Sequence, residues 1–335
     1  MAARHGYGRI HARAGGCALA RVRAARSGLT CAGRLVGAGS SSDRAFSAPP
    51  PQFVIARFLR EIRIEHTLFA LPFAYVGALF AAHGFPSWHA LLWITLAVVG
   101  ARTAAMAANR YFDRDIDARN PRTARRALAA GKLSPALMLW AVVLGVLLLA
   151  VSALMLNPLC FKLLPIAAAG VLLYPLCKRF TWSTHFVLGA VDALAPIGAF
   201  VAVAGTVRVP AVLLFLAVML WVAGFDIIYA LMDYAVDRQQ GLASIPARFG
   251  QLAARRVPFA LHTAMVLALA WAGYVAAASG WYFVGIVAAG ALMVYEIAQM
   301  RAAANLFVLN ERIFVANMAF SLIFLGTTWA GFTLR

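Results

Sequence analysis

Two stretches of the sequence, about 120 residues apart, carry carboxylates at a spacing of four residues. Their members are Asn109, Asp113 and Asp117 in the first stretch and Tyr229, Asp233 and Asp237 in the second. In an α-helix, residues at i, i+4 and i+8 lie on one stripe, about 6 Å apart along the axis. Each stretch is therefore predicted to be a helix that points its polar side chains in one direction.

Clusters of carboxylates repel one another unless a cation neutralises them. Mg²⁺ is the expected cation, because it prefers oxygen ligands and is typically held by one or two carboxylates together with substrate phosphate oxygens. The basic residues around the motifs are predicted to bind such an anionic substrate. Arg122 and Arg126, which follow the first motif, are the residues expected to reach phosphate oxygens. Asp115 points away from Asp113 on the same helix and is expected to be a solvated surface charge.

Three further charged residues lie within apolar segments, where ionisable groups are costly and are often functional. Arg102 is seven residues before Asn109 and so on the same face, where it is predicted to bind diphosphate or an acceptor. Asp192 and Asp226 are predicted either to pair with basic residues across the bundle or to assist proton removal. His185 and His262 are expected to be polar groups near the membrane interface.

Nine apolar segments are long enough to cross about 30 Å of hydrocarbon, which predicts an all-α integral membrane protein. The predicted spans are 67–83, 88–108, 137–156, 159–176, 184–204, 211–232, 259–279, 281–299 and 313–332. Asn157 and Pro158 separate the third and fourth spans, which could instead form one bent helix. A composition of 63% hydrophobic and 13% charged residues excludes a water-soluble globular protein.

The nine spans place 18 basic residues of the predicted membrane domain on the side of the two motifs and 3 on the other side. Lys and Arg favour cytoplasmic loops, so this uneven distribution predicts that the motif side faces the cytoplasm. The net charge of +18 is therefore attributed to membrane-flanking residues and not to nucleic-acid binding. We expect the active site on the cytoplasmic side of a bacterial inner membrane.

Residues 1–52 contain eight arginines and one acidic residue, and this composition is typical of a disordered leader. The leader could be an organelle transit peptide, which would place the protein in the mitochondrial inner membrane, or the product of a misassigned start codon. Residues 53–335 are predicted to form the membrane domain. Within it, four spans separate the two motifs, which predicts two repeated four-helix halves followed by a ninth helix.

The segments NRYFDRDIDARNPRTARRALAAGKLSP and FDIIYALMDYAVDRQQGLASIPARFG resemble the two signature regions of the UbiA superfamily of intramembrane aromatic prenyltransferases. The resemblance covers nearly all of residues 55–335. It implies a nine-helix bundle with a central cavity open laterally to lipid. It also implies that the aspartates of both motifs hold Mg²⁺ on the diphosphate of a polyprenyl donor. By family position, Arg63 and Lys178 are expected to contact that diphosphate.

Within the superfamily, the sequence is most similar to bacterial 4-hydroxybenzoate polyprenyltransferases, including a menaquinone-pathway branch. The resemblance implies transfer of a polyprenyl group to an aromatic ring carbon, with 4-hydroxybenzoate as the expected acceptor. A dihydroxynaphthoate acceptor remains an alternative, since Ala127 stands where many members have proline. Haem is a further alternative acceptor within the superfamily. A membrane transporter is a more distant alternative, for which acidic residues near the bilayer midplane would be expected.

Overall fold

The computed structural model describes residues 51–63, 65–302 and 305–334. The chain divides into two units, Met1–Ala48 and Pro49–Arg335, and the fold described below is that of the second unit. Residues 1–50 of the predicted leader lie outside the described residues. The first helix, α1, begins at Pro51.

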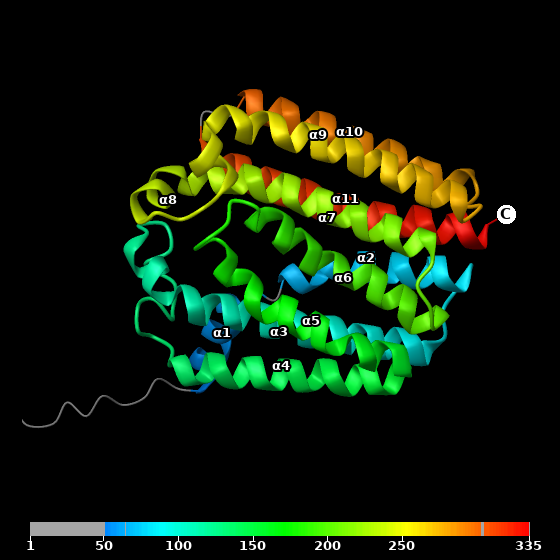
Figure 1. The fold of residues 1–335 in the computed structure, drawn as a ribbon, viewed down its shortest axis with the longest axis horizontal. Coiled ribbons are helices and arrows are strands. Elements are labelled where there is room, and N and C mark those ends of the chain that lie inside the picture. Colours follow the sequence, from blue (N-terminus) through cyan, green and yellow to red (C-terminus); the bar gives the residue numbers. More distant parts are fainter. Residues whose placement is uncertain (1–50, 64, 303–304, 335) are drawn as a thin grey trace, which may run out of the picture. The chain divides into compact units, whose positions relative to one another are not determined.

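Every regular element in the described ranges is a helix (Figure 1). In chain order these are α1 (Pro51–Glu61), α2 (Glu65–Ala82), α3 (Trp88–Arg119), α4 (Pro135–Leu156), α5 (Pro158–Cys177), α6 (Thr184–Ala204), α7 (Val209–Tyr229), the 3₁₀ turn η1 (Ala230–Asp233), α8 (Tyr234–Gln240), α9 (Ile245–Val275), α10 (Gly280–Ala302) and α11 (Leu306–Thr333). The prediction of an all-α protein is confirmed.

The nine predicted spans correspond to α2 to α7 and α9 to α11. Eight helical segments are long and apolar enough to cross a membrane, and α2 contributes a shorter apolar stretch, Phe69–Ala82. The alternative of one bent helix over 137–176 is wrong, because α4 ends at Leu156 and α5 starts at Pro158. The Asn157 side chain caps α5 by accepting a hydrogen bond from the Cys160 amide at 2.9 Å.

Large apolar side chains cover the outside of the bundle. Leu144, Ile166, Leu267 and Val287 on four different helices are each 61% to 72% exposed. Exposed apolar surface on this scale is unfavourable in water but suits a protein surrounded by lipid tails. The chain is an integral membrane protein.

Small residues allow neighbouring helices to approach closely. A Cβ atom at Gly100 of α3 would lie 2.7 Å from the Gly145 carbonyl oxygen of α4, and one at Gly145 would lie 2.7 Å from the Gly100 oxygen. Such contact between backbones is typical of helix pairs in membranes, where van der Waals packing drives association. The resulting α3–α4 pair fixes the helix that carries the first motif.

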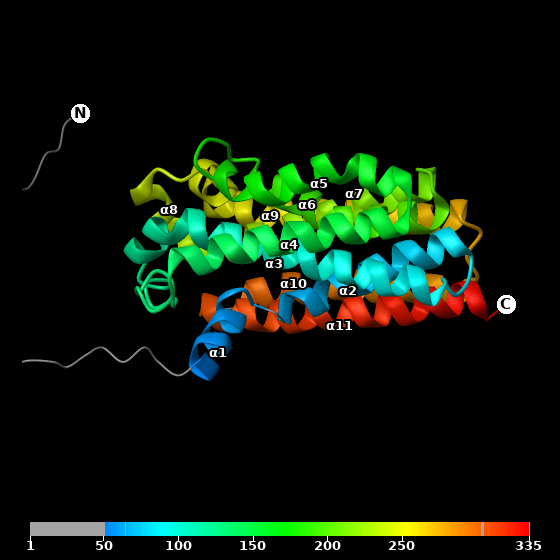
Figure 2. The ribbon, with the colours of Figure 1, turned by 90° about the horizontal axis from the view of Figure 1, so that it is seen from below.

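Both motif regions lie at the same end of the bundle. Figures 1 and 2 show α8 and the connection from α3 to α4 at this end, next to α1. Helix α3 is 32 residues long, or about 48 Å, and so extends beyond a hydrocarbon core of about 30 Å. In each predicted four-helix half the motif helix comes second, and it packs on the helix after the motif connection: α3 on α4, and α7 on α9.

Candidate active site

The first motif lies on the last turns of α3 and keeps the predicted helical stripe. The Asn109 amide donates a hydrogen bond to Asp113 Oδ2 at 3.1 Å, as expected for side chains four residues apart on one face. Asp113 and Asp117 are both buried, whereas the Asp115 side chain is 74% exposed and contacts Arg114. The helix therefore turns two carboxylates inward and one outward.

Basic side chains neutralise both inward carboxylates. Lys178, which follows α5, donates to Asp113 Oδ2 at 2.6 Å, and Arg126 donates to the two Asp117 oxygens at 2.9 and 2.7 Å. Arg179 lies 3.8 Å from the other Asp113 oxygen. Unpaired buried carboxylates would be strongly unfavourable, so these cations stabilise the ionised acids.

The second motif departs from the predicted single stripe. Helix α7 ends at Tyr229, the turn η1 follows, and α8 begins at Tyr234. A 3₁₀ turn has 3.0 residues per turn and a rise of about 2.0 Å, so side chains four residues apart no longer align across it. The prediction that Tyr229, Asp233 and Asp237 share one helical stripe is wrong, although all three side chains still line one cavity.

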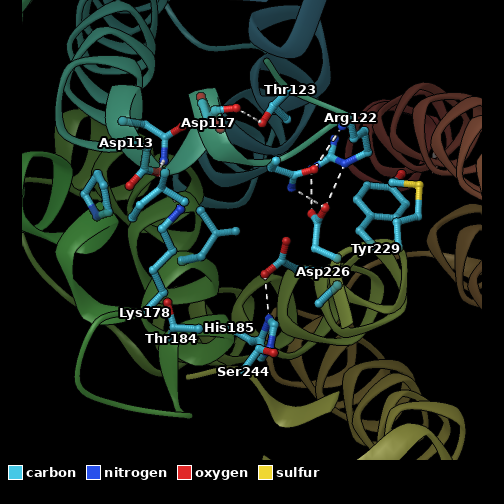
Figure 3. A pocket seen from close by; sticks show the side chains of 18 of the residues that line it. Asp113, Asp117, Arg122, Thr123, Lys178, Thr184, His185, Asp226, Tyr229 and Ser244 are labelled. Atoms are coloured by element: carbon cyan, nitrogen blue, oxygen red, sulfur yellow. Dashed lines mark hydrogen bonds and ion pairs between the residues drawn. The ribbon is translucent and has the colours of Figure 1, made fainter. Parts of the chain in front are cut away.

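Residues of the connection from α3 to α4, called the first connection from here on, contact the second motif directly. Arg122 contacts both oxygens of Asp233, with Nε 2.9 Å from Oδ1, and the Asn120 amide donates to Oδ1 at 2.9 Å. Asp237 accepts a hydrogen bond at 3.0 Å from the hydroxyl of Ser244, whose side chain also caps α9. Stretches that lie far apart in the sequence therefore converge on one site (Figure 3).

A cavity of about 960 Å³ brings the predicted site residues together. All thirteen of them line it: Arg63, Arg102, Asn109, Asp113, Asp117, Arg122, Arg126, Lys178, Asp192, Asp226, Tyr229, Asp233 and Asp237. The acids of both motifs lie at the end of the bundle where the connections meet and not halfway along the long helices.

Two further acids of the cavity, Asp192 and Asp226, each pair with a base on another helix. Asp192 of α6 lies 2.6 Å from Arg102 of α3, and both side chains are 13% exposed. Asp226 of α7 lies 2.7 Å from His185 Nδ1, whose Nε2 accepts a hydrogen bond from the Ile245 amide (Figure 3). The expectation that His185 is an interfacial polar group is wrong, since this side chain is buried between α7 and α9.

The first connection is also braced by a residue that the sequence did not single out. Glu61 at the end of α1 is buried, and its carboxylate accepts hydrogen bonds from the Ala127 and Leu128 amides at 2.8 and 3.4 Å. The backbone oxygen of Glu61 also accepts a hydrogen bond from Arg110. Helix α1 thus fixes the loop that presents Arg122.

The oxygen donors of the site fit a hard divalent cation. Asp113 Oδ1 is buried and accepts no hydrogen bond, so one oxygen of the motif is available as a ligand. In the described part of the chain, His, Cys, Asp and Glu form no group of three that could hold a metal alone. Mg²⁺ commonly completes its shell with water and substrate phosphate oxygens, which suits a site of separate carboxylates.

An all-helical membrane bundle with this cavity defines an intramembrane protein whose charged and polar side chains converge at one end of its helices. The profile of the UbiA prenyltransferase family matches residues 70–327. The chain belongs to the UbiA prenyltransferase family, and it is an enzyme that transfers prenyl groups.

Relatives from bacteria share much of the sequence. A 4-hydroxybenzoate octaprenyltransferase from Thiobacillus denitrificans is 37% identical over 225 residues, which cover 66% of this chain and 75% of the relative. A protein of the same name from Marinobacter nauticus is 33% identical over 286 residues, covering 83% of this chain and 91% of the relative.

Solved structures share the fold. The apo structure of a UbiA homologue from Aeropyrum pernix K1 matches with a TM-score of 0.72 and 34% identity, covering 79% of this chain and 97% of that one. A UbiA homologue from Archaeoglobus fulgidus, solved with GPP and Mg²⁺, matches with a TM-score of 0.63 and 19% identity. The match covers 81% of this chain and 99% of the homologue. At that identity the second match supports the fold alone.

Proposed function

We propose that this protein transfers a polyprenyl group from polyprenyl diphosphate to a ring carbon of 4-hydroxybenzoate, in a Mg²⁺-dependent step of quinone biosynthesis. The observation that carries the proposal is the convergence of both Asp motifs, each with basic partners, on one cavity at one end of the membrane bundle. The names of the bacterial relatives support 4-hydroxybenzoate as the acceptor.

The donor diphosphate is expected to bind between the two motifs. Asp113, Asp117, Asp233 and Asp237 would hold Mg²⁺, which neutralises negative charge on the departing diphosphate when it is bound. The buried Asp113 Oδ1, which accepts no hydrogen bond from the described residues, supports this assignment. In this structure the motif carboxylates pair with three basic residues, Lys178, Arg122 and Arg126. We expect each of these basic side chains to contact a phosphate oxygen when the donor is bound.

The residues at this end of the cavity favour heterolysis of the allylic C–O bond. The electron pair of that bond leaves with the diphosphate, where the basic side chains stabilise it. The ring carbon ortho to the acceptor hydroxyl then forms the new C–C bond. The ring proton leaves to diphosphate or to a carboxylate such as Asp226, which is 2.7 Å from a histidine that can share the proton.

The apolar walls of the bundle protect this chemistry and admit the substrate. They keep water away from the allylic cation, and the surrounding lipid accommodates an isoprenoid chain. Basic residues gather at the motif end, so we place the active site at the cytoplasmic face of a bacterial inner membrane.

The test uses purified protein in detergent with Mg²⁺, labelled polyprenyl diphosphate and either 4-hydroxybenzoate or a dihydroxynaphthoate. We expect prenylated 4-hydroxybenzoate, and we expect EDTA or Asp113→Ala to abolish its formation. Asp115→Ala is the matched control, because Asp115 lies two residues away on the exposed face. Product formation with the dihydroxynaphthoate alone would refute 4-hydroxybenzoate as the acceptor. Substantial turnover by folded Asp113→Ala would show that Asp113 is not a ligand of the metal.

A further inference from the structure

Asn310 is a buried amide without a partner at the wall of the cavity. It lies on α11, is 8% exposed and lines the cavity. Neither its Oδ1 nor its Nδ2 makes a hydrogen bond within the described part of the chain. Buried polar groups that lack partners are costly, and at a cavity wall they point to a ligand that supplies the missing bonds.

The second buried asparagine of the same helix shows what a structural role looks like. Asn317 donates to Glu296 Oε1 at 2.8 Å and accepts from Trp221 Nε1 at 2.6 Å. Its amide is thus satisfied on both sides by protein groups from α7 and α10. Asn310 has no such partners, so fold stability does not account for its amide.

Aromatic rings form the wall of the cavity in this region. The ring centroids of Phe69 and Phe314 are 6.3 Å apart with nearly parallel planes, and Phe225 contacts Phe69 edge-on at 5.6 Å. Tyr229 follows at 5.5 Å from Phe225. Figure 3 shows Tyr229 across the pocket from Asp113 and Lys178. The aromatic wall, which runs from Phe314 of α11 to Tyr229 of α7, is therefore on the opposite side of the cavity from Asp113 and Lys178, while Arg122 lies on the Tyr229 side.

The chemistry of an amide selects among the groups that this wall could receive. An isoprenoid chain offers neither donor nor acceptor. A diphosphate or an ionised carboxylate only accepts, and it would leave the Asn310 oxygen unpaired against negative charge. A phenolic hydroxyl both donates and accepts, and its aromatic ring suits the neighbouring rings.

This inference rests on the proposed function. We propose that Asn310 positions the aromatic acceptor by accepting a hydrogen bond from its phenolic hydroxyl, with the ring against Phe69, Phe225, Phe314 and Tyr229. An O–H that donates to an amide oxygen polarises toward phenolate, which raises electron density at the ortho carbon. Asn310 thus fixes which ring edge faces the donor.

The experiment measures prenyl transfer by Asn310→Leu in the full-length protein, with the acceptor and the donor titrated separately. We expect the KM for 4-hydroxybenzoate to rise about 10-fold, the effect of losing about one hydrogen bond, while the KM for polyprenyl diphosphate changes less than about twofold. Val308→Ala is the matched control: Val308 is on the same helix, is 42% exposed and does not line the cavity. We expect it to leave both constants unchanged.

Benzoate, which lacks the hydroxyl, serves as a competitive inhibitor in the same assay. We expect its inhibition constant to be equal in the wild type and in Asn310→Leu, because it has no group for Asn310 to bind. The thermal midpoint of the variant should not fall, since leucine of similar size removes an unpaired amide. An unchanged acceptor KM, or a benzoate constant that rises in parallel with that KM, would overturn the proposal. A wild-type protein that prenylates no hydroxyaryl acid would instead overturn the proposed function, and this inference with it.

Discussion

The Arg122 guanidinium holds the Asp233 carboxylate in a paired geometry that lysine cannot copy. Two guanidinium nitrogens face two carboxylate oxygens, and the Asn120 amide supports one of them. Lysine keeps the charge but presents it as a single point. We expect Arg122→Lys to lower kcat/KM for the polyprenyl donor about 10-fold, because the paired contact orients the motif as well as neutralising it.

Arg114→Lys provides the control for this measurement in the same steady-state assay. Arg114 is in the same region, is 40% exposed, and contacts Asp115 and the Tyr111 ring on the outer face. We expect its activity to stay within about twofold of the wild type, as is usual for exposed charges. Equal losses in both variants would show that the paired Arg122–Asp233 contact is not what sets activity, since Arg114 lies outside that contact.

At the residue scale, the sequence predicted most of the charged side chains that line the cavity but not how they pair, and it did not single out Arg110, Arg125 or Glu311. Asp113 and Asp117 could be placed because four-residue spacing on a continuous helix determines direction. Glu61, His185 and Asn310 could not, because their roles depend on contacts with residues 60 or more positions away or on the shape of the cavity. A buried histidine and an interfacial histidine look alike in one sequence.

The helix elements reveal a second buried polar cluster, which ties α7, α9 and α10 together. His262 Nδ1 lies 2.7 Å from Glu296 Oε2, and His262 Nε2 lies 3.1 Å from the Trp221 carbonyl oxygen. His262 and Glu296 are almost fully buried, so the expectation that His262 is interfacial is also wrong. Breaking such a pair leaves an uncompensated polar group in an apolar interior.

Gly224 makes this contact possible, and its replacement tests the cluster. A Cβ atom at Gly224 would lie 2.2 Å from His262 Nε2, so alanine must displace the ring from the Trp221 carbonyl. We expect Gly224→Ala to destabilise the protein by about 1–3 kcal/mol, the usual cost of overpacking. The measurement is the thermal midpoint in detergent.

Gly290→Ala in α10 is the matched control, because nothing lies within 4 Å of its added methyl group. Alanine is the better helix former there, so we expect an equal or higher midpoint. If Gly224→Ala has the same thermal midpoint as Gly290→Ala, the His262 ring can move aside without cost, and the cluster contributes little to stability.

The break in the second motif also belongs to the element scale. Apolar length and four-residue spacing predicted that α7 continues through Asp237, as α3 does through Asp117. The chain forms η1 instead, and Asp233 then meets Arg122 and Asn120 of the first connection. The spacing of residues within one segment cannot predict such a turn, because the contacts that Asp233 makes there are with a segment more than 100 residues away.

At the scale of the whole membrane domain, the distribution of basic residues predicts orientation. The motif end carries the basic residues of α1, of the connection from α3 to α4, and of α8 and the start of α9, while the connection from α6 to α7 carries only Arg208. Lys and Arg near span ends favour the cytoplasmic side. The cavity that we propose for the diphosphate should therefore open to the cytoplasm.

Single cysteines, introduced into a variant that lacks the four native cysteines, test this orientation in bacterial spheroplasts. Gln239→Cys places a thiol at the exposed end of α8, and Val207→Cys places one at the opposite end, where Val207 is 46% exposed. We expect a membrane-impermeant maleimide added outside spheroplasts to label Val207→Cys, and to label Gln239→Cys only after lysis. The reverse pattern would place the motif end outside, and a soluble cytoplasmic 4-hydroxybenzoate pool could then not reach the cavity without first crossing the bilayer.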